Sequence, residues 1–467
     1  MDIIGETRIH GRPQHQRRQQ ERNFQSAQGR YEHTSHGACY AGAPRRGIFM
    51  KRATDWFATA MLCVLIGAAV RAAQSQARPP VAPQGAAGPP LRPQYQVKPP
   101  DSPQVFETET VRIRVVPFAR GLDHPWSLAF LPNGDMLVTE RPGRLRIIRG
   151  GVLDSTPITG VPSVFAVNMQ GLMSVALHPK FADNKLIYLT YSKRGDKGLT
   201  ATALARGRLE GNTLTDVRDI FITAPWVAPT AMASTLLFAR DGSLYMTVGG
   251  AINAATTGQL AQDPSNHYGK ILRLRDDGSV PPDNPFVGRA GYKPEIYSMG
   301  HRNQLGLTLH PVTGALWESE NGPQGGDEIN VILPGRNYGW PLPTYGREYS
   351  GAPITETPVR RDMESPFVFW VPSIGASGIA FYTGDRFPTW KGSLLVGGLS
   401  GRAIHRIKFN QNGWEDTVRP REYLLTDVKQ RIREVKQGPD GLVYFLTNGF
   451  DLRDDLEGLV LKIEPAE

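Results

Sequence analysis

Ala239-Arg-Asp-Gly-Ser-Leu-Tyr-Met246 decides the fold prediction, because a turn-forming Asp-Gly pair is followed at once by a short apolar strand. Related segments recur along the chain, each with a turn-forming stretch followed by β-branched, aromatic or other apolar residues. The other five are Leu131-Pro-Asn-Gly-Asp-Met-Leu-Val, His178-Pro-Lys-Phe-Ala-Asp-Asn-Lys-Leu-Ile-Tyr-Leu, His310-Pro-Val-Thr-Gly-Ala-Leu-Trp, Pro388-Thr-Trp-Lys-Gly-Ser-Leu-Leu-Val and Gly438-Pro-Asp-Gly-Leu-Val-Tyr-Phe.

The spacing of these six segments indicates the architecture. They start at residues 131, 178, 239, 310, 388 and 438. The intervals between these starts are close to or longer than the length of a four-stranded propeller blade, and we assign the excess residues to loops between strands. We therefore predict an all-β, six-bladed β-propeller. Residues 111–116 and 459–463 are expected to share one blade, which would close the ring and remove exposed edges. Two stacked β-sandwiches are the alternative.

The N-terminal part has a different composition. Residues 1–49 are rich in Arg, Gln and His and are predicted to be a disordered extension. Residues 50–76 combine a basic start, an apolar run and small residues, which predicts a cleaved export signal; an uncleaved anchor is the alternative. Residues 77–106 form a Pro-rich linker, and residues 107–467 form the propeller. The mature protein is expected in the periplasm or outside the cell, without a stable membrane span.

Charge and cysteine usage exclude several functions. Residues 1–104 hold 14 basic and 6 acidic residues, whereas the remainder holds 39 and 38, so the predicted propeller is almost neutral and nucleic acid is not a favoured partner. Both cysteines, Cys39 and Cys63, lie in the N-terminal part. The predicted mature protein therefore has no disulfide, no thiolate metal site and no cysteine nucleophile.

Residues 300–341 form the strongest candidate site. Gly300-His-Arg-Asn303, Glu320-Asn-Gly-Pro-Gln-Gly-Gly-Asp-Glu-Ile-Asn330 and Asn337-Tyr-Gly-Trp-Pro341 combine glycines with charged and aromatic side chains. This mixture is typical of a loop that holds a ligand or a metal. Locally, a set of tight turns capped by side chains such as Asp327 is an equally good interpretation.

Several motifs resemble one known family along about residues 110–465. They include Gly121-Leu-Asp-His-Pro-Trp, Thr139-Glu-Arg, Gly171-Leu-Met-Ser-Val-Ala-Leu-His-Pro, His267-Tyr-Gly-Lys-Ile-Leu-Arg-Leu, Asp283-Asn-Pro-Phe, the segments of residues 300–341 and Gln430-Arg-Ile-Arg-Glu-Val. In this order they resemble the soluble quinoprotein glucose/sorbosone dehydrogenases, also called aldose sugar dehydrogenases. The resemblance implies a six-bladed propeller that binds pyrroloquinoline quinone (PQQ) and calcium and oxidises aldoses.

The resemblance also implies roles for individual residues. Backbone carbonyls of Gly322 and Pro323 match those that meet the cofactor calcium, and Glu328 and Tyr338 match residues at a second, structural calcium. The residues that match the PQQ-binding positions are Arg431, Arg433 and Ser373. Paired guanidinium groups suit the carboxylates of this cofactor, although the two arginines could instead pair with neighbouring acidic side chains.

Departures from the family pattern affect the catalytic positions. The family's catalytic histidine is replaced by Ala231, and the nearby arginine by Thr235. The usual Gly-Asp-x-x-Arg is absent from residues 249–254, and a substrate-side glutamine falls at Met169, beside Gln170. Ser400 stands where some members have a cofactor-binding lysine. His301 is the best remaining candidate for a catalytic base, because Arg302 is its sequence neighbour and Glu320 is expected on an adjacent loop.

Two functional hypotheses follow. The first is a PQQ-dependent oxidoreductase that oxidises an aldose sugar or a related alcohol in the periplasm, with an unidentified electron acceptor. The second is a non-catalytic propeller of the same descent that binds a sugar, a cell-wall fragment or a protein. The retained calcium loop and arginine pair favour the first, and the replacements at Ala231 and Thr235 favour the second.

Overall fold

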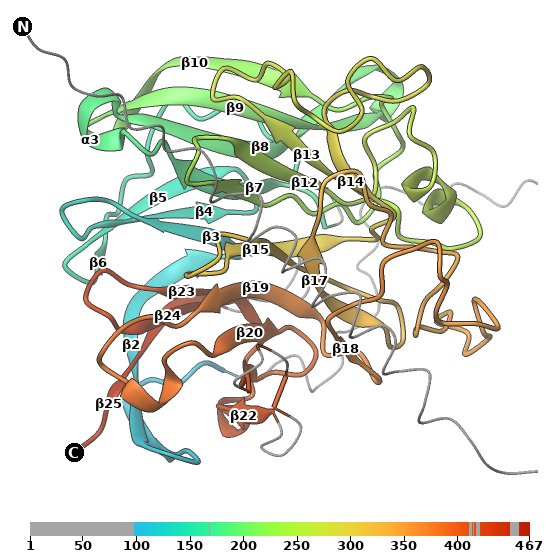
Figure 1. Cartoon of the computed structure of the whole chain (residues 1–467). Coiled ribbons are helices and arrows are strands. Elements are labelled where there is room, and N and C mark those ends of the chain that lie inside the picture. The colour runs from blue at the N-terminus through green and yellow to red at the C-terminus, as the bar shows by residue number, and fades with distance from the viewer. Residues whose placement is uncertain (1–97, 168, 411–412, 414, 417–420, 449–456) are drawn as a thin grey trace, which may run out of the picture. The chain divides into compact units, whose positions relative to one another are not determined.

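The computed structural model describes residues 98–467 except 168, 411–412, 414, 417–420 and 449–456 (Figure 1). The predicted extension, the export signal and most of the linker lie outside the described residues. Sheet pairing begins within the last residues of the predicted linker, because β1 (Gln104–Glu107) pairs with β2 (Arg112–Asp123). The other predicted boundaries stay predictions.

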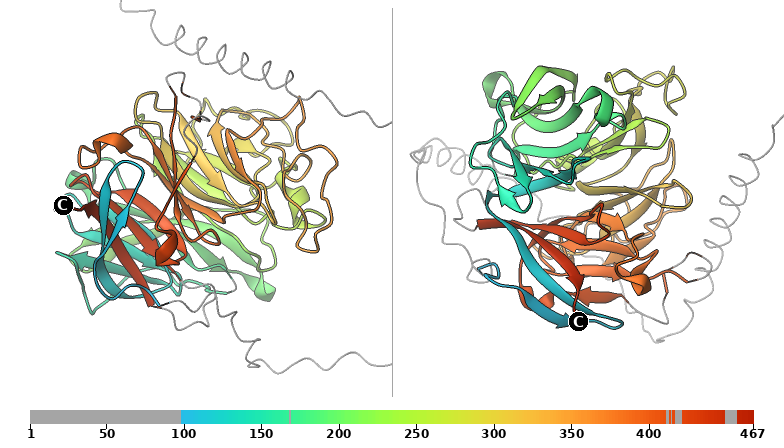
Figure 2. Two further views of the ribbon diagram at one scale, coloured as in Figure 1. Left: turned by 90° about the horizontal axis from the view of Figure 1, so that it is seen from below. Right: turned by 90° about the vertical axis from the view of Figure 1, so that its left-hand side faces the viewer.

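The described residues form six sheets arranged as the blades of a propeller, as predicted (Figures 1 and 2). The first three sheets to be completed along the chain have four strands each. They are β3 (Pro125–Phe130), β4 (Met136–Glu140), β5 (Arg144–Arg149) and β6 (Val152–Leu153); β7 (Leu172–Leu177), β8 (Leu186–Arg194), β9 (Thr200–Glu210) and β10 (Thr213–Ile222); and β11 (Leu236–Phe238), β12 (Leu244–Val248), β13 (Lys270–Leu274) and β14 (Ile296–Met299).

Two further blades also have four strands, and the last has five. They are β15 (Gln304–Leu309), β16 (Leu316–Glu320), β17 (Asp327–Ile332) and β18 (Val368–Trp370); β19 (Ala376–Phe381), β20 (Leu394–Gly398), β21 (Ile404–Ile407) and β22 (Glu422–Leu424); and β23 (Ile432–Gln437), β24 (Val443–Thr447) and β25 (Glu457–Pro465) with β2 and β1. Within the part of the chain that the structure describes, the helices are short: α3 (Phe181–Asn184) and 3-10 turns at Asp196–Gly198, Thr257–Ala261, Pro388–Trp390 and Thr426–Val428.

The ring closes where the sequence predicted. Strands β2 and β25 are antiparallel neighbours, with Val115 opposite Ile463 (Figure 2). The inner strand of this sheet, β23, packs beside β3 of the next blade. Because the two ends of the propeller are hydrogen-bonded in one sheet, the ring has no open edge at its junction.

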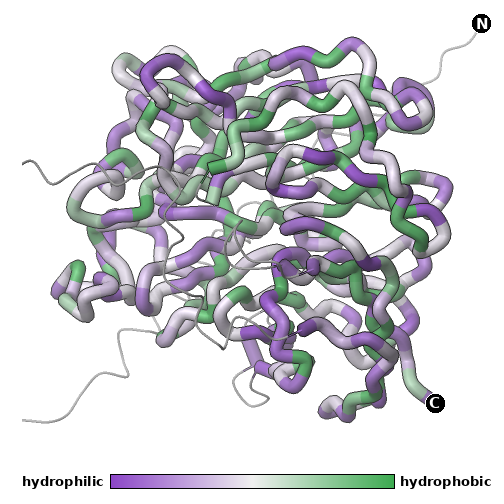
Figure 3. The backbone as a smooth tube through the Cα atoms, turned by 180° about the vertical axis from the view of Figure 1, so that it is seen from behind, coloured by the Kyte–Doolittle hydropathy of each residue, from purple (hydrophilic) through white to green (hydrophobic). Residues whose placement is uncertain are grey.

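Each of the six recurring segments forms the turn between the first and second strands of a blade. In the segment that starts at Ala239, Gly242 has φ +83°, and in the segment that starts at Gly438, Gly441 has φ +78°. Positive φ is strained for residues with a side chain, which explains the glycine in five of the six segments. The segment that starts at His178 has no glycine, and Lys185 has φ +55° there. The apolar residues after each turn form the buried second strand, and Figure 3 shows hydrophobic and hydrophilic stretches alternating along the backbone.

Buried hydroxyl groups join neighbouring blades. Each donates to a backbone carbonyl of the inner strand of the next blade, so these hydroxyl groups are satisfied by protein atoms. The bonds are Thr139 to Met173 (2.5 Å), Thr235 to Leu305 (3.1 Å), Ser319 to Ser377 (2.5 Å) and Ser377 to Ile432 (2.7 Å).

One apolar cluster joins five of the six blades, and we call it the apolar plug. Five buried residues from five different blades make up this cluster: Trp126, Met173, Ala233, Leu305 and Leu399. The sixth blade contributes Arg433, whose guanidinium carbon lies 3.3 Å from the centroid of the Trp126 ring. No helix among the described residues is long and apolar enough to cross a membrane.

Candidate functional site

A group of buried arginines lies beside the plug. Arg431 and Arg433 are 9% and 4% exposed, and Arg141 at the end of β4 is 1% exposed. Burial, followed by the charges of Arg141 and Arg431, holds the pKa of Arg433 well below its usual value, while Glu434 opposes the shift. These buried guanidinium groups repel one another. They therefore suit an anionic ligand, because the carboxylates of such a ligand would offset the repulsion.

The contacts of Arg433 fit this role. Its ring partner Trp126 fixes the plane of the guanidinium group. Its Nε has no hydrogen-bond acceptor among the described residues. Arg431 donates from Nη1 to the carbonyl of Leu399 at 3.2 Å. The two predicted cofactor residues therefore lie close to each other, with Arg433 on β23 and Arg431 immediately before that strand.

The predicted calcium loop is held by one buried carboxylate. Asp327 Oδ1 accepts the backbone N–H of Gly322, and Oδ2 accepts those of Ile374 and Ala376, all at 2.9 Å. Burial raises the pKa of Asp327, although these bonds act in the opposite direction. Ser373 joins the same arrangement, since its Oγ accepts the backbone N–H of Gly325 at 2.7 Å.

Glycine is required at position 322 for a steric reason. A Cβ atom there would lie 2.0 Å from the carbonyl oxygen of Gly325 and 2.4 Å from the carbonyl carbon of Gly326. The chain therefore folds back on itself at Gly322-Pro323, and only a residue without a side chain permits this turn. The predicted residues Gly322, Pro323 and Ser373 thus lie on adjoining loops.

A small cavity lies beside this loop. It brings together Gly322 with Glu328 and Tyr338, which the sequence predicted at two separate calcium positions. Carboxylate and backbone oxygens are the donors that calcium prefers, so the lining suits that ion. The full lining is Arg302, Glu320, Asn321, Gly322, Gly326, Glu328, Tyr338, Trp340, Pro343 and Thr344.

Next to the cavity, three acidic side chains surround one amide group. Asn330 Nδ2 donates to Glu318 Oε2 at 3.2 Å, to Glu320 Oε1 at 3.1 Å and to Glu328 Oε2 at 3.4 Å. The pairing of β16 with β17 produces this arrangement, because Glu318 lies opposite Asn330 and Glu320 opposite Glu328. Burial, reinforced by the Glu320 charge, raises the pKa of both Glu318 and Glu328.

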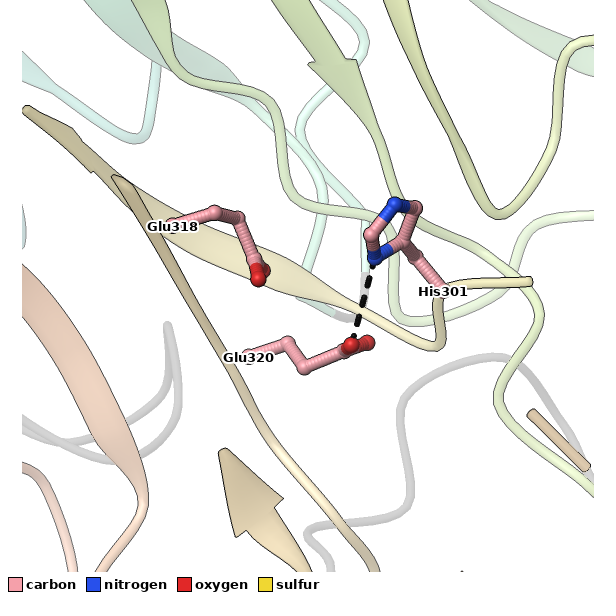
Figure 4. Close-up of side chains that lie close together, drawn as sticks. All are labelled: His301, Glu318 and Glu320. Carbon is pink, nitrogen blue, oxygen red and sulfur yellow. Dashed lines mark hydrogen bonds and ion pairs between the residues drawn. The ribbon is translucent and has the colours of Figure 1, made fainter. Parts of the chain in front are cut away.

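His301 belongs to this acidic cluster. Its Nδ1 lies 3.2 Å from Glu320 Oε1 (Figure 4). Its Nε2 lies 2.9 Å from Ser298 Oγ. The ring is 0% exposed and stacks on Tyr338. His301 does not line the cavity. Its assignment as a catalytic base stays a prediction, but both ring nitrogens already face protein atoms.

The other histidines of the described motifs are also held by protein atoms. His267 Nδ1 accepts the backbone N–H of Ala224 at 2.8 Å, and His124 Nδ1 lies 2.6 Å from Asp123 Oδ1. His178 and His310 accept backbone N–H groups in their own turns. These contacts position loops and do not require a catalytic role.

The replaced segments are packed into the protein. Asn303 Oδ1 accepts the backbone N–H of Ala233 at 3.0 Å, and Arg302 donates to the carbonyls of Ile252 and Asn321 at 2.9 Å. Residues 232–235 are buried and Ala231 is half-buried. The segment that lacks the family histidine therefore offers backbone and small side chains to its surroundings.

Two other departures have local explanations. Gln170 is 0% exposed and donates to Thr200 Oγ1 at 3.1 Å, so it is used inside its own blade. Ser400 Oγ donates to the carbonyl of Ser373 at 3.4 Å. Ser400 therefore lies beside a predicted cofactor residue, although it is too short to replace a lysine.

Sequence reasoning missed Glu318, Asn330 and Arg141 as parts of these clusters. Glu318 and Glu320 share one face of β16 by their spacing of two, which is a detectable pattern. The opposing Asn330 requires knowledge of the strand register. Arg141 requires knowledge of which blades meet at the centre of the ring.

Comparison with known proteins places this geometry in one family. A family model described as Glucose / Sorbosone dehydrogenase matches residues 122–453. The chain belongs to the glucose/sorbosone dehydrogenase family. The matched residues include strands from all six blades of the propeller.

Individual members of the glucose/sorbosone dehydrogenase family are similar over most of their length. The aldose sugar dehydrogenase YliI of Escherichia coli K12 is 42% identical over 350 residues, which cover 74% of this chain and 91% of the relative. The crystal structure of the soluble aldose sugar dehydrogenase from Escherichia coli in the apo-form superposes with a TM-score of 0.70 at 39% identity, covering 76% of this chain and 100% of that one. The PQQ-bound aldose sugar dehydrogenase of Streptomyces coelicolor gives a TM-score of 0.59 at 26% identity, covering 78% and 100%.

Proposed function

We propose that this family member is a PQQ-dependent oxidoreductase that acts on an aldose sugar or a related alcohol in the periplasm. The observation that carries the proposal is the group of buried guanidinium groups around Arg433. Relatives named as aldose sugar dehydrogenases, one of them PQQ-bound, support the substrate class and the cofactor. The predicted export signal at residues 50–76 supports the location.

The residues present fit the cofactor. PQQ is a tricarboxylate, and Arg431 and Arg433 would hold its carboxylates. The Trp126 ring packs against the guanidinium group of Arg433. Ser373 adjoins the loop of Gly322 and Pro323, whose carbonyls would hold calcium. A second calcium would be held by Glu328 and Tyr338, which line the cavity beside that loop. When bound, PQQ accepts a hydride and calcium polarises its quinone oxygen.

The side chains of this chain set limits on the reaction. A general base usually contributes about 10² to 10⁴-fold to a proton-transfer step. Position 231 offers only a methyl group, and His301 is enclosed by Ser298 and Glu320. We therefore expect turnover well below that of a family member with the usual histidine. The turnover that remains would come from the positioning of the cofactor.

The packed segment at residues 231–235 favours a second candidate function. A propeller that binds a sugar, a cell-wall fragment or a protein without oxidising it needs no base. The hydrogen bond from the backbone N–H of Ala233 to Asn303 Oδ1 joins this segment to the loop that contains Arg302. Ligand binding that persists without dye reduction is the expected behaviour of such a protein.

A cofactor titration tests the proposal. Purified protein is mixed with calcium and PQQ, uptake is followed by absorbance, and dye reduction is then assayed with a panel of aldoses. We expect saturable uptake and slow turnover. In R433M, uptake should weaken by at least about tenfold, because one charged hydrogen-bonding group is lost.

Arg218 provides the matched control, since it is exposed on β10. R218M should bind PQQ as tightly as the unmodified protein. Absence of uptake by the unmodified protein would overturn the cofactor assignment. Uptake without turnover on any aldose would favour the binding alternative.

A further inference from the structure

The acidic cluster behind the cavity has a feature that the calcium positions leave unexplained. One ligand atom each from His301, Glu318 and Glu320 lies within 4.8 Å of the others. All three side chains are almost completely buried, with exposed fractions of 0%, 0% and 3%. Figure 4 shows both carboxylates and the imidazole ring pointing toward a common space.

Hydrogen bonding within the protein does not satisfy this cluster. Glu318 Oε1 has no hydrogen-bond partner among the described residues, and neither has Asn330 Oδ1. The Asn330 amide nitrogen is shared among three carboxylates. Glu320 also accepts the backbone N–H of Arg302, but Glu318 has only its share of the Asn330 amide. A buried carboxylate needs a compensating positive charge or a full set of donors, and Glu318 has neither among the described residues.

Binding of a metal ion would compensate the buried carboxylates better than protonation of Glu318 would. A protonated Glu318 Oε1 would become a donor, and no acceptor is hydrogen-bonded to it among the described residues. A cation accepts electron pairs from both carboxylates at once and also removes the repulsion between them. Ligand atoms this close to one another can converge on one ion with small side-chain movements.

His301 is prepared as a nitrogen ligand. Its Nε2 lies 2.9 Å from Ser298 Oγ, so a tautomer protonated at Nε2 would donate to that hydroxyl and leave the Nδ1 lone pair free for a metal ion on the side of Glu320. The Tyr338 ring stacks on the imidazole with centroids 4.7 Å apart and fixes its plane. Metal-ligating histidines commonly have such a partner on the second nitrogen.

We propose that Glu318, Glu320 and His301 bind one first-row transition-metal ion, with Mn²⁺ and Zn²⁺ as the fitting species. Mixed imidazole and carboxylate donors suit these ions, whereas calcium prefers six to eight oxygen ligands. The site adjoins the calcium positions assigned to the loop of Gly322 and to Glu328, because Glu320 lines that cavity, but the other two ligands, Glu318 and His301, do not line it. The ion joins β16 to the loop before β15.

Metal binding by PQQ-free protein tests the proposal. After dialysis against EDTA, Mn²⁺ is titrated and its free concentration is followed by electron paramagnetic resonance, and Zn²⁺ is added as a competitor. We expect one tightly held Mn²⁺ per chain, displacement by Zn²⁺ and a rise in melting temperature. Absence of binding by the unmodified protein to either ion would overturn the proposal.

Variants assign the ion to its ligands. E318Q should weaken Mn²⁺ binding by about a hundredfold or more and raise the melting temperature of the metal-free protein, because carboxylate repulsion is removed. E318D keeps the negative charge, but its side chain is one methylene shorter, so the carboxylate lies farther from the ion. This variant should weaken Mn²⁺ binding by about tenfold or more. E356Q changes an exposed glutamate and should behave as the unmodified protein.

The outcome is independent of the proposed dehydrogenase activity, because no PQQ is present. Unchanged Mn²⁺ affinity in E318Q would contradict the assignment. Loss of Mn²⁺ binding in E328Q together with retention in E318Q would also overturn it, since the ion would then belong to the calcium position.

Discussion

Protonation of His405 on β21 should destabilise the fold in mild acid. The ring is 3% exposed, and neither ring nitrogen has a hydrogen-bond partner among the described residues. It packs edge-on against Trp370 and Tyr423, with centroids 5.8 Å and 4.8 Å away. Burial, and then the charge of Arg421, lowers the pKa of His405 from 6.5 to about 4.

The sign and size of the effect follow from these two pKa values. Between pH 6.5 and 4 the unfolded chain binds a proton at His405 and the folded protein does not, so acidification favours unfolding. A shift of this size corresponds to about 3 kcal/mol of stability at most, present above the unfolded pKa and lost as the pH falls to about 4. Below the folded pKa, no further loss arises from this residue.

Urea unfolding at pH 7.5, 6.5, 5.5 and 4.5 measures the effect. Other groups also titrate, so the quantity of interest is the stability of the unmodified protein minus that of H405L. This difference should fall by roughly 2 to 3 kcal/mol between pH 7.5 and 4.5. R421Q removes the second cause of the shift and should reduce the fall. Parallel stability curves for the unmodified protein and H405L would refute the reasoning.

Three further predictions concern the ring and its centre. T139V removes the hydroxyl that donates to the Met173 carbonyl and should cost about 1 to 3 kcal/mol in urea unfolding; a loss below about 0.5 kcal/mol would show that this bond is unimportant. G322A places a Cβ 2.0 Å from the Gly325 carbonyl oxygen and should abolish calcium-dependent PQQ uptake while far-ultraviolet circular dichroism is retained; normal uptake would contradict the loop assignment. A231H should raise dye-reduction turnover by about tenfold or more, with A231Q as the control; no increase favours the binding alternative.

The sequence by itself determined the blades and their closure. The recurring turn segments predicted six repeats because turn-forming residues followed at once by an apolar strand form a local pattern, and five of the six segments have a glycine with positive φ in the turn. The pairing of β2 with β25 followed from the need to remove sheet edges at the two ends of the propeller.

Only the tertiary structure decided which of these groups meet. Asn330 reaches Glu318 because of the register of β16 and β17, and His301 reaches the cluster from a loop that precedes β15. Arg141 influences Arg433 because β4 and β23 belong to blades that become neighbours when the ring closes. Burial, partner number and charge repulsion are properties of these assembled groups, and local sequence patterns do not encode them.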